Sequence, residues 1–287
     1  MNLKSKFGIF FYLILQNRVV WSFLSSFEKE KIKKNNFYFN NYRTDYTPKN
    51  YQNSMSWDKF NKQKDYRKWS EFLGRYLKKK NLSILEIGPG SGYYSNFLCN
   101  NKNVSSYTFY EINKSFRNYL TYKLNKLSKK NFQFYSIDKN FLKFKNYKKF
   151  DLIIFLSSFH HIPDRKEYFD ACYNLLKNNS GKIIFIEPTH YFFRIVAILK
   201  KFFKYYIYED TNKLYKNLGT HHFCTEAEFI YLSKKKNLDI KIEYKVFSKK
   251  VNFLLETYNL KFLSKIIKKY FSGELYLVCE KNLMINK

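Results

Sequence analysis

The chain has 287 residues, of which 53 are basic and 23 acidic, so its formal charge at pH 7 is +30. This length is sufficient for one well-filled core plus an appendage. The basic residues are 46 Lys and only 7 Arg, and Asn, Ile, Phe and Tyr are abundant too. These are the residues that AT-rich codons encode, so an AT-rich genome would raise the number of lysines throughout the chain. The charge therefore favours a solvated lysine surface, and leaves a polyanion or an anionic membrane surface as the less favoured partner.

The four cysteines lie far apart, at Cys99, Cys172, Cys224 and Cys279, without a CxxC pair or a Cys/His cluster. This spacing argues against a zinc site and against a disulfide framework. We therefore expect no metal and a reducing, cytoplasmic environment.

The first apolar segment, Phe7–Leu15, is interrupted by three polar residues before a second apolar run that ends at Leu24. A membrane-spanning helix needs ~20 mostly apolar residues, and no small-x-small cleavage site follows. Residues 1–60 are predicted to be a helical and basic N-terminal extension. Its helix either docks on the domain, which we slightly favour, or makes peripheral membrane contact through residues 7–24 with Trp21 as an anchor.

From residue 25 to 60 the chain is polar and basic, and little regular structure is expected. Apolar residues then recur every three or four positions from Tyr66 to Leu77, which predicts a helix. After this helix, apolar strands alternate with helical segments, a pattern typical of a parallel sheet covered on both faces. Strands are expected at Ser83–Ile87, Ser105–Tyr110, Phe132–Ile137, Leu152–Leu156, Lys182–Ile186, Asp239–Val246 and Glu274–Cys279. Further helices are expected at about 93–98, 114–127 and 165–176.

The regular alternation of strands and helices ends after the fifth strand. An aromatic, basic and apolar segment predicts a helical insertion at about 189–220. Thr225 is expected to cap a helix over 225–235, because Glu228 follows it at the spacing of a capping box. An amphipathic helix near 260–270 separates the last two strands.

These elements predict an α/β fold: a Rossmann-like, doubly wound, seven-stranded sheet, mostly parallel with an antiparallel last strand. The sheet and its helices belong to a domain over residues 61–287. The N-terminal helical extension precedes it.

Three of the eight glycines, Gly88, Gly90 and Gly92, fall within five residues between a strand and a helix. Glycines there let a ligand approach main-chain N–H groups at a helix N-terminus. The dinucleotide fingerprint G-x-G-x-x-G places its third glycine where this chain has Tyr93. Glu86 would repel a pyrophosphate and attract a ligand that carries ammonium and sulfonium groups. A nicotinamide or flavin cofactor, or a glycine turn without a ligand, are the less favoured alternatives.

The segment Ile84–Gly92 (ILEIGPGSG) resembles the first motif of the class I, S-adenosylmethionine-dependent methyltransferases. In that family an acidic residue ending the second strand holds the ribose hydroxyls, and one ending the third strand meets the adenine amino group. A carboxylate on a diol also occurs in the dinucleotide folds. The resemblance implies S-adenosylmethionine as cofactor, bound by Glu86, Gly88, Gly90, Gly92, Glu111, Asp138 and Leu156.

Residues 150–164 (FDLIIFLSSFHHIPD) resemble the fourth-strand motif of the small-molecule and lipid branch of that family, which has a type 11/12 methyltransferase domain. Residues 175–177 and 181–188 resemble the fifth helix and strand of that branch. The resemblance covers about residues 65–190 well and 220–280 loosely.

All five histidines lie between residues 160 and 222, near the rim of the predicted sheet where ligands bind. Displacement at the methyl carbon of a sulfonium requires a positioned acceptor and exclusion of water, and an oxygen or nitrogen acceptor can need a base. His160, His161 and His221 are the candidate bases, although the first two can equally be structural. Glu187 is expected either to orient the substrate or to bind a helix N-terminus.

The predicted function is methyl transfer to a small-molecule, glycan or lipid-linked acceptor, at oxygen or nitrogen rather than carbon. The apolar insertion is either a lid over such an acceptor or packing for the N-terminal helix. An RNA methyltransferase that uses the basic surface is the alternative. It is disfavoured because the family's Asn/Asp-Pro-Pro-Tyr-like stretch is replaced by Leu156–Phe159, and the chain has no Pro-Cys and no recognisable RNA-binding module. A non-catalytic, cofactor-binding scaffold is the second alternative.

Overall fold

The computed structural model describes residues 25, 26, 30, 57–62, 66–127, 129, 132–137, 140–144, 149–162, 165–177, 180–188, 224, 226–246 and 272–281. The predicted N-terminal helix, the insertion at 189–220, the cap residue Thr225 and the helix near 260–270 lie outside the described residues. Within the ranges given above, no helix has the length and apolar character that crossing a membrane requires.

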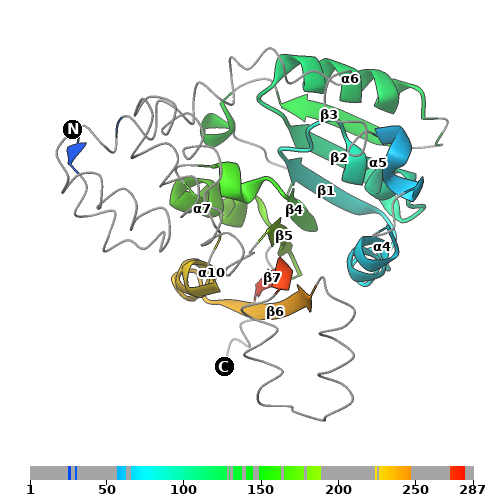
Figure 1. The fold of residues 1–287 in the computed structure, drawn as a ribbon. Coiled ribbons are helices and arrows are strands. Elements are labelled where there is room, and N and C mark those ends of the chain that lie inside the picture. The colour runs from blue at the N-terminus through cyan, green and yellow to red at the C-terminus, as the bar shows by residue number, and fades with distance from the viewer. Residues whose placement is uncertain are drawn as a thin grey trace, which may run out of the picture.

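A single seven-stranded sheet in the order β3-β2-β1-β4-β5-β7-β6 runs through the described fold (Figure 1). Neighbours from β3 to β5 pair in parallel, and β7 runs antiparallel to both β5 and β6. This topology confirms the predicted fold class. The strands are β1 Leu82–Ile87, β2 Val104–Tyr110, β3 Gln133–Ile137, β4 Leu152–Leu156, β5 Lys182–Pro188, β6 Leu238–Val246 and β7 Ser272–Lys281.

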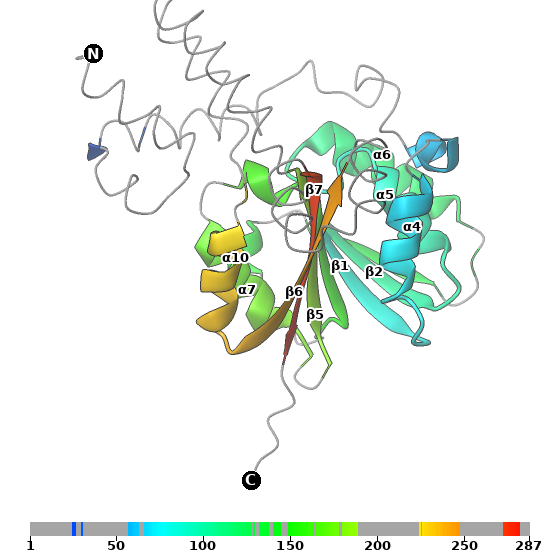
Figure 2. The ribbon, with the colours of Figure 1, turned by 60° about the horizontal axis from the view of Figure 1, so that its bottom comes forward.

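Helices cover both faces of the sheet. Figure 2 shows α4, α5 and α6 on one side and α7 and α10 on the other. Their bounds are α4 Tyr66–Gly74, α5 Tyr93–Asn100, α6 Lys114–Asn125, α7 Arg165–Leu175 and α10 Glu226–Lys234, with 3-10 helices η1 Trp57–Lys62, η2 Phe141–Lys143 and η3 Phe159–His161. The alternation of strands and helices predicted this doubly wound arrangement.

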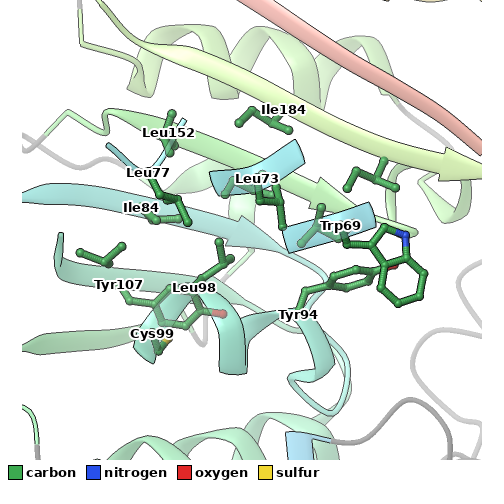
Figure 3. Close-up of a cluster of buried hydrophobic side chains, with 14 of the residues drawn as sticks. Trp69, Leu73, Leu77, Ile84, Tyr94, Leu98, Cys99, Tyr107, Leu152 and Ile184 are labelled. Atoms are coloured by element: carbon green, nitrogen blue, oxygen red, sulfur yellow. The ribbon is translucent and has the colours of Figure 1, made fainter. Parts of the chain in front are cut away.

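Two apolar clusters fill the space between the sheet and its helices. Alternate residues of β1 point to opposite clusters: Ile84 packs with α4 and α5, and Leu85 packs on the side of α7. In the first cluster, Trp69 and Tyr94 lie next to each other with ring centroids 5.3 Å apart (Figure 3). Because both faces are covered, the central strands are continuous apolar runs, as parallel strands in such sheets are.

The segment before α4 is more ordered at its end than the sequence predicts. The expectation of little regular structure over 25–60 is wrong for its last residues, which form η1. Trp57 and Phe60 are buried in the first cluster, and the Asn96 side-chain amide of α5 donates to the Trp57 carbonyl oxygen at 2.5 Å. One turn of 3-10 helix is too short to show an apolar period. The residues just before position 61 thus contribute to the core of the sheet and its helices.

Candidate functional site

The loop between β1 and α5 depends on three glycines in the left-handed region. The φ angles are +70° at Gly88, +58° at Gly90 and +77° at Gly92, which other residues rarely adopt. A Cβ atom added at Gly90 would meet no atom within 4 Å, whereas one at Gly88 would lie 2.8 Å from Ser158 Cβ. Gly90 thus leaves space beside the loop, and Gly88 lets the loop close against Ser158, two residues after the end of β4.

Gly92 has a packing role that the sequence analysis did not anticipate. It caps the N-terminus of α5. A Cβ atom there would lie 2.6 Å from Leu120 Cδ1 and 3.0 Å from Trp57 Cε3. The glycine therefore allows α6 and η1 to approach α5, and any contact with a ligand would be through its backbone.

Glu86, at the end of β1, is buried, with 1 % of its surface exposed. Its Oε2 atom accepts hydrogen bonds from the Tyr107 hydroxyl at 2.5 Å and from Ser95 Oγ at 2.8 Å. Burial raises the pKa of Glu86 to about 7, although both hydrogen bonds act to lower it. Its Oε1 atom is buried and has no hydrogen-bond partner among the described residues. A buried acceptor without a partner is costly and marks a place where a ligand donor fits.

Glu111 follows β2 directly and is also buried. Its Oε2 atom accepts the Gly90 N–H and its Oε1 atom accepts the Asn113 N–H, each at 2.8 Å. Burial raises the pKa of this carboxyl, and the backbone donors of Asn113 and Gly90 oppose that effect. Because each carboxylate oxygen accepts more than one hydrogen bond, the group retains acceptor capacity for a ligand.

Of the other residues predicted to bind the cofactor, one lies in the core and one is outside the described residues. Leu156, the last residue of β4, is 5 % exposed and packs in the cluster beneath α4 and α5. Asp138 and His221 lie outside the described residues. The structure thus brings Glu86, the glycine loop, Glu111 and Leu156 to the carboxyl edge of the adjacent strands β2, β1 and β4.

On the far side of β4, Glu187 and His160 form a buried pair. Glu187, on β5, has no exposed surface, and its Oε2 atom lies 2.6 Å from His160 Nδ1. Its Oε1 atom accepts the N–H groups of Ser158 and Phe159, so Glu187 binds the N-terminus of η3, one of the two roles expected for it. The His161 ring centroid lies 3.9 Å from that of His160.

The contact between His160 and Glu187 was not predicted from the sequence. The two residues are 27 positions apart, but each follows or ends one of two adjacent parallel strands. Their positions at the ends of β4 and β5 were the signal available in the sequence. In the part of the chain that the structure describes, no group of three His, Cys, Asp or Glu residues is placed to hold a metal.

Residues 85–181 match a family model described as a methyltransferase domain, Methyltransf_12. The matched segment contains the glycine loop, Glu111 and His160. The chain carries a class I methyltransferase domain. No curated protein matches the sequence.

Three solved structures illustrate the likeness of the methyltransferase fold. Magnesium protoporphyrin IX methyltransferase from Synechocystis PCC 6803, with bound SAH, has a TM-score of 0.56 and 12% identity, over 88% of this chain and 100% of that one. Phosphoethanolamine N-methyltransferase 2 from Haemonchus contortus, with S-adenosyl-L-methionine, has a TM-score of 0.54 and 13% identity, over 86% and 59%. The plantazolicin methyltransferase BpumL has a TM-score of 0.52 and 19% identity, over 88% and 99%. At these identities the likeness is one of fold.

The described residues fit a ligand with an ammonium group and a ribose. Glu86 Oε1 is a buried acceptor in need of a donor. The space beside Gly90 admits a ligand next to the loop. Glu111 is a carboxylate fixed by two backbone N–H groups at the end of β2.

Proposed function

We propose that the protein transfers the methyl group of S-adenosylmethionine to an oxygen or nitrogen atom of a small-molecule, glycan or lipid-linked acceptor. The observation that carries the proposal is the buried Oε1 atom of Glu86, which has no hydrogen-bond partner among the described residues and lies by an open glycine loop. The solved structures named above support the acceptor class, because magnesium protoporphyrin IX and phosphoethanolamine are small molecules.

In this proposal the carboxyl edge of β1 and β2 holds the methyl donor. Glu86 accepts a hydrogen bond from the ammonium group, and Glu111 accepts from the ribose hydroxyls. The backbone of Gly88, Gly90 and Gly92 lies against the ligand, Asp138 meets the adenine amino group, and Leu156 contributes an apolar contact. When bound, the cofactor supplies a methyl carbon activated by its sulfonium.

The acceptor binds beside the ends of β4 and β5. His160 and His161 are placed there by η3, and His221 is proposed from the sequence alone. A base among them takes the proton that an oxygen or nitrogen acceptor loses. The apolar side chains packed around these strand ends reduce the access of water to that proton transfer.

The first test is calorimetric titration of S-adenosylmethionine, and separately of its demethylated product, into the purified protein. We expect micromolar binding that falls at least about a hundredfold in Gly90→Arg, because the added side chain enters the space beside the loop. Gly74→Arg is the matched control, since a Cβ atom there also meets nothing within 4 Å and Gly74 lies at the end of α4.

Thermal unfolding of both variants separates loss of binding from loss of fold, because Gly90 has a positive φ angle and the substitution is strained. A folded wild-type protein that does not bind the donor would overturn the proposal and leave the scaffold interpretation. Transfer of labelled methyl groups to RNA, and not to small molecules, glycans or lipids, would contradict the acceptor class.

A further inference from the structure

Glu86, Tyr107 and Ser95 come together on the face of the sheet that α5 covers. Ile84 of β1 pairs with Tyr107 of β2, so Glu86, two residues later on β1, lies on the same face and nearer the carboxyl edge. Ser95, in the first turn of α5, lies against the glycine loop, since a Cβ atom added at Gly92 would be 3.6 Å from Ser95 Cβ. All three side chains are buried, so one carboxyl is enclosed with two hydroxyls.

The oxygen atoms of these three side chains form a closed triangle. The Tyr107 hydroxyl lies 2.5 Å from Glu86 Oε2 and 2.8 Å from Ser95 Oγ, and Ser95 Oγ lies 2.8 Å from Glu86 Oε2. Each hydroxyl has a single proton to donate, so an ionised carboxylate leaves one of the three contacts without a proton. A proton on Glu86 Oε2 fills that contact, because the carboxyl then donates to one hydroxyl and accepts from the other. The geometry therefore favours a protonated Glu86 in the ligand-free protein.

The groups around this triangle also favour the protonated carboxyl. Burial has the largest effect and, together with the charge of Glu111, raises the pKa of Glu86 to about 7 against the two hydrogen bonds. On α5, burial holds the pKa of the Cys99 thiol well above its ordinary value, and burial does the same for Tyr107 on β2, so both groups stay neutral. Lys129 donates to the Cys99 carbonyl oxygen at 3.1 Å, near the C-terminal end of α5.

We propose that Tyr107 and Ser95 are positioning residues that hold a proton on Glu86 Oε2, and that binding of the methyl donor exchanges this proton for the donor's ammonium group. The proposal rests on the proposed function, in which Glu86 accepts a hydrogen bond from that ammonium. The Oε1 atom is buried and has no hydrogen-bond partner among the described residues, so it is the oxygen left for the ligand. A positive charge at Oε1 favours the ionised carboxyl, and the proton leaves Oε2 for water.

This exchange makes the site select its ligands by charge and by pH. An ammonium group compensates the buried carboxylate, whereas a nucleoside without one leaves Glu86 protonated and forms no ion pair there. Because the proton must leave before the ion pair forms, the affinity for the donor falls as the pH drops below about 7 and levels off above it. The demethylated product keeps the ammonium, so its affinity follows the same dependence.

The test is calorimetric titration of the purified protein with the donor and with its demethylated product. The range runs from about pH 5.5 to about pH 7.5, below the value near 8 at which an α-amino group loses its proton. We expect both dissociation constants to be roughly twentyfold higher at the acidic limit. At about pH 6, titrations in buffers of different ionisation enthalpy should show release of about one proton per ligand bound.

The matched control ligand is 5′-methylthioadenosine. Like the demethylated product it has an adenosine and an uncharged sulfur, but it lacks the ammonium group. Burial also raises the pKa of Glu111, the carboxyl proposed to hold the ribose, so this ligand measures the part of any pH dependence that comes from Glu111. We expect its affinity to change much less with pH than that of the product.

Two variants separate the exchange from a purely structural role. Glu86→Gln keeps the size of the side chain and has no proton to lose, so the product should bind weakly at every pH while 5′-methylthioadenosine binds as before. Tyr107→Phe removes a hydrogen bond that favours the ionised carboxyl, so the pH at which affinity levels off should rise. If Tyr107 only packed in the core, both ligands would weaken equally and this pH would not move. Tyr122→Phe, at an exposed tyrosine of α6, is the control and should change neither.

Infrared spectroscopy of the ligand-free protein detects the proton on Glu86 without any ligand. We expect a carboxylic-acid C=O band that is missing in Glu86→Gln and that disappears as the pH rises through about 7. Absence of this band at about pH 5.5, or equal pH dependence for the product and 5′-methylthioadenosine, would overturn the proposal. The second comparison uses the wild type alone and decides even if a variant does not fold. Failure of the donor and product to bind at any pH would instead overturn the proposed function, and the infrared band would still report the proton on Glu86.

Discussion

The pKa values of buried carboxyl groups are shifted in opposite directions at the two edges of the sheet. At the carboxyl edge, burial raises the pKa values of Glu86 and Glu187 to about 7 and about 8. At the amino edge, burial alone would raise the pKa of Asp151, but hydrogen bonds from Lys177 and the Ser83 N–H bring it below its ordinary value. For Glu86 and Glu187 burial outweighs the hydrogen bonds that each carboxyl accepts, so the ionised form is unfavourable, whereas the lysine beside Asp151 compensates for its burial.

This difference predicts how the stability of the cofactor-free protein depends on pH. The folded-state pKa of Glu86 lies above its unfolded value near 4.5, so the stability it contributes is present below about pH 4.5 and is lost as pH rises through about 7. We expect Tm to fall between about pH 5 and pH 8, and Glu86→Gln to reduce the fall by on the order of 5 °C. Thermal unfolding across this range measures both.

Glu280→Gln is the matched control, because the pKa of Glu280 is lowered, by Lys182 against the effect of burial, and the group is already ionised in this range. An equal fall in wild type and Glu86→Gln would contradict the prediction. Glu187 and Glu111, whose pKa values burial also raises, account for the part of the fall that is expected to remain in Glu86→Gln.

At the residue scale, the sequence predicts groups that belong to one local motif and misses groups that meet through strand register. Glu86, the glycines and Glu111 were located because each lies at a strand end in a familiar order. The hydrogen bonds of Glu86 with Tyr107 and Ser95 depend on how β2 and α5 pack on β1. The contact of His160 with Glu187 likewise requires the pairing of β4 with β5.

At the scale of elements, the best predicted parts are the strands. Their expected bounds agree with the structure to within a few residues, because central strands buried on both faces stand out as apolar runs. The 3-10 helices were missed, since three to six residues are too few to show a period. Among them η1 contributes Trp57 and Phe60 to the core, so a short element can matter more to packing than its length suggests.

The close packing of η1 and α6 against Gly92, at the start of α5, lets us predict how Gly92→Ala changes stability. The new Cβ atom would approach Leu120 Cδ1 at 2.6 Å, and alanine is strained at a φ of +77°. We expect the free energy of unfolding to fall by roughly 2–4 kcal/mol. Urea unfolding measures the change, and the loss caused by Gly92→Ala should be smaller in a Leu120→Ala background than in the wild type, because that background lacks the Cδ1 atom.

Gly74→Ala is the control for this substitution, because a Cβ atom there meets nothing within 4 Å. A loss in Gly92→Ala no larger than in Gly74→Ala would show that α6 and η1 do not constrain the glycine. An equal loss from Gly92→Ala in the wild-type and Leu120→Ala backgrounds would leave the positive φ angle as the whole cause.

For the whole molecule, the formal charge of +30 opposes compaction through self-repulsion. Added salt shortens the screening length from about 10 Å at 0.1 M to about 3 Å at 1 M. We expect Tm to rise over this range of sodium chloride, most steeply at the low end. An uncharged osmolyte in place of salt controls for solvent effects, and a steady fall in Tm would mean that ion pairs such as Lys177 with Asp151 outweigh the repulsion.

The position of β7 has a consequence for biosynthesis. This strand is the last of the seven along the chain, yet it lies inside the sheet, between β5 and β6. On the ribosome, β1 to β5 emerge and can pair while β5 presents an open apolar edge, and β6 appears with no neighbour to join. An open edge of this kind invites pairing with other chains. The nascent protein therefore stays vulnerable to aggregation until residues 272–281 leave the exit tunnel, long after the glycine loop has been made.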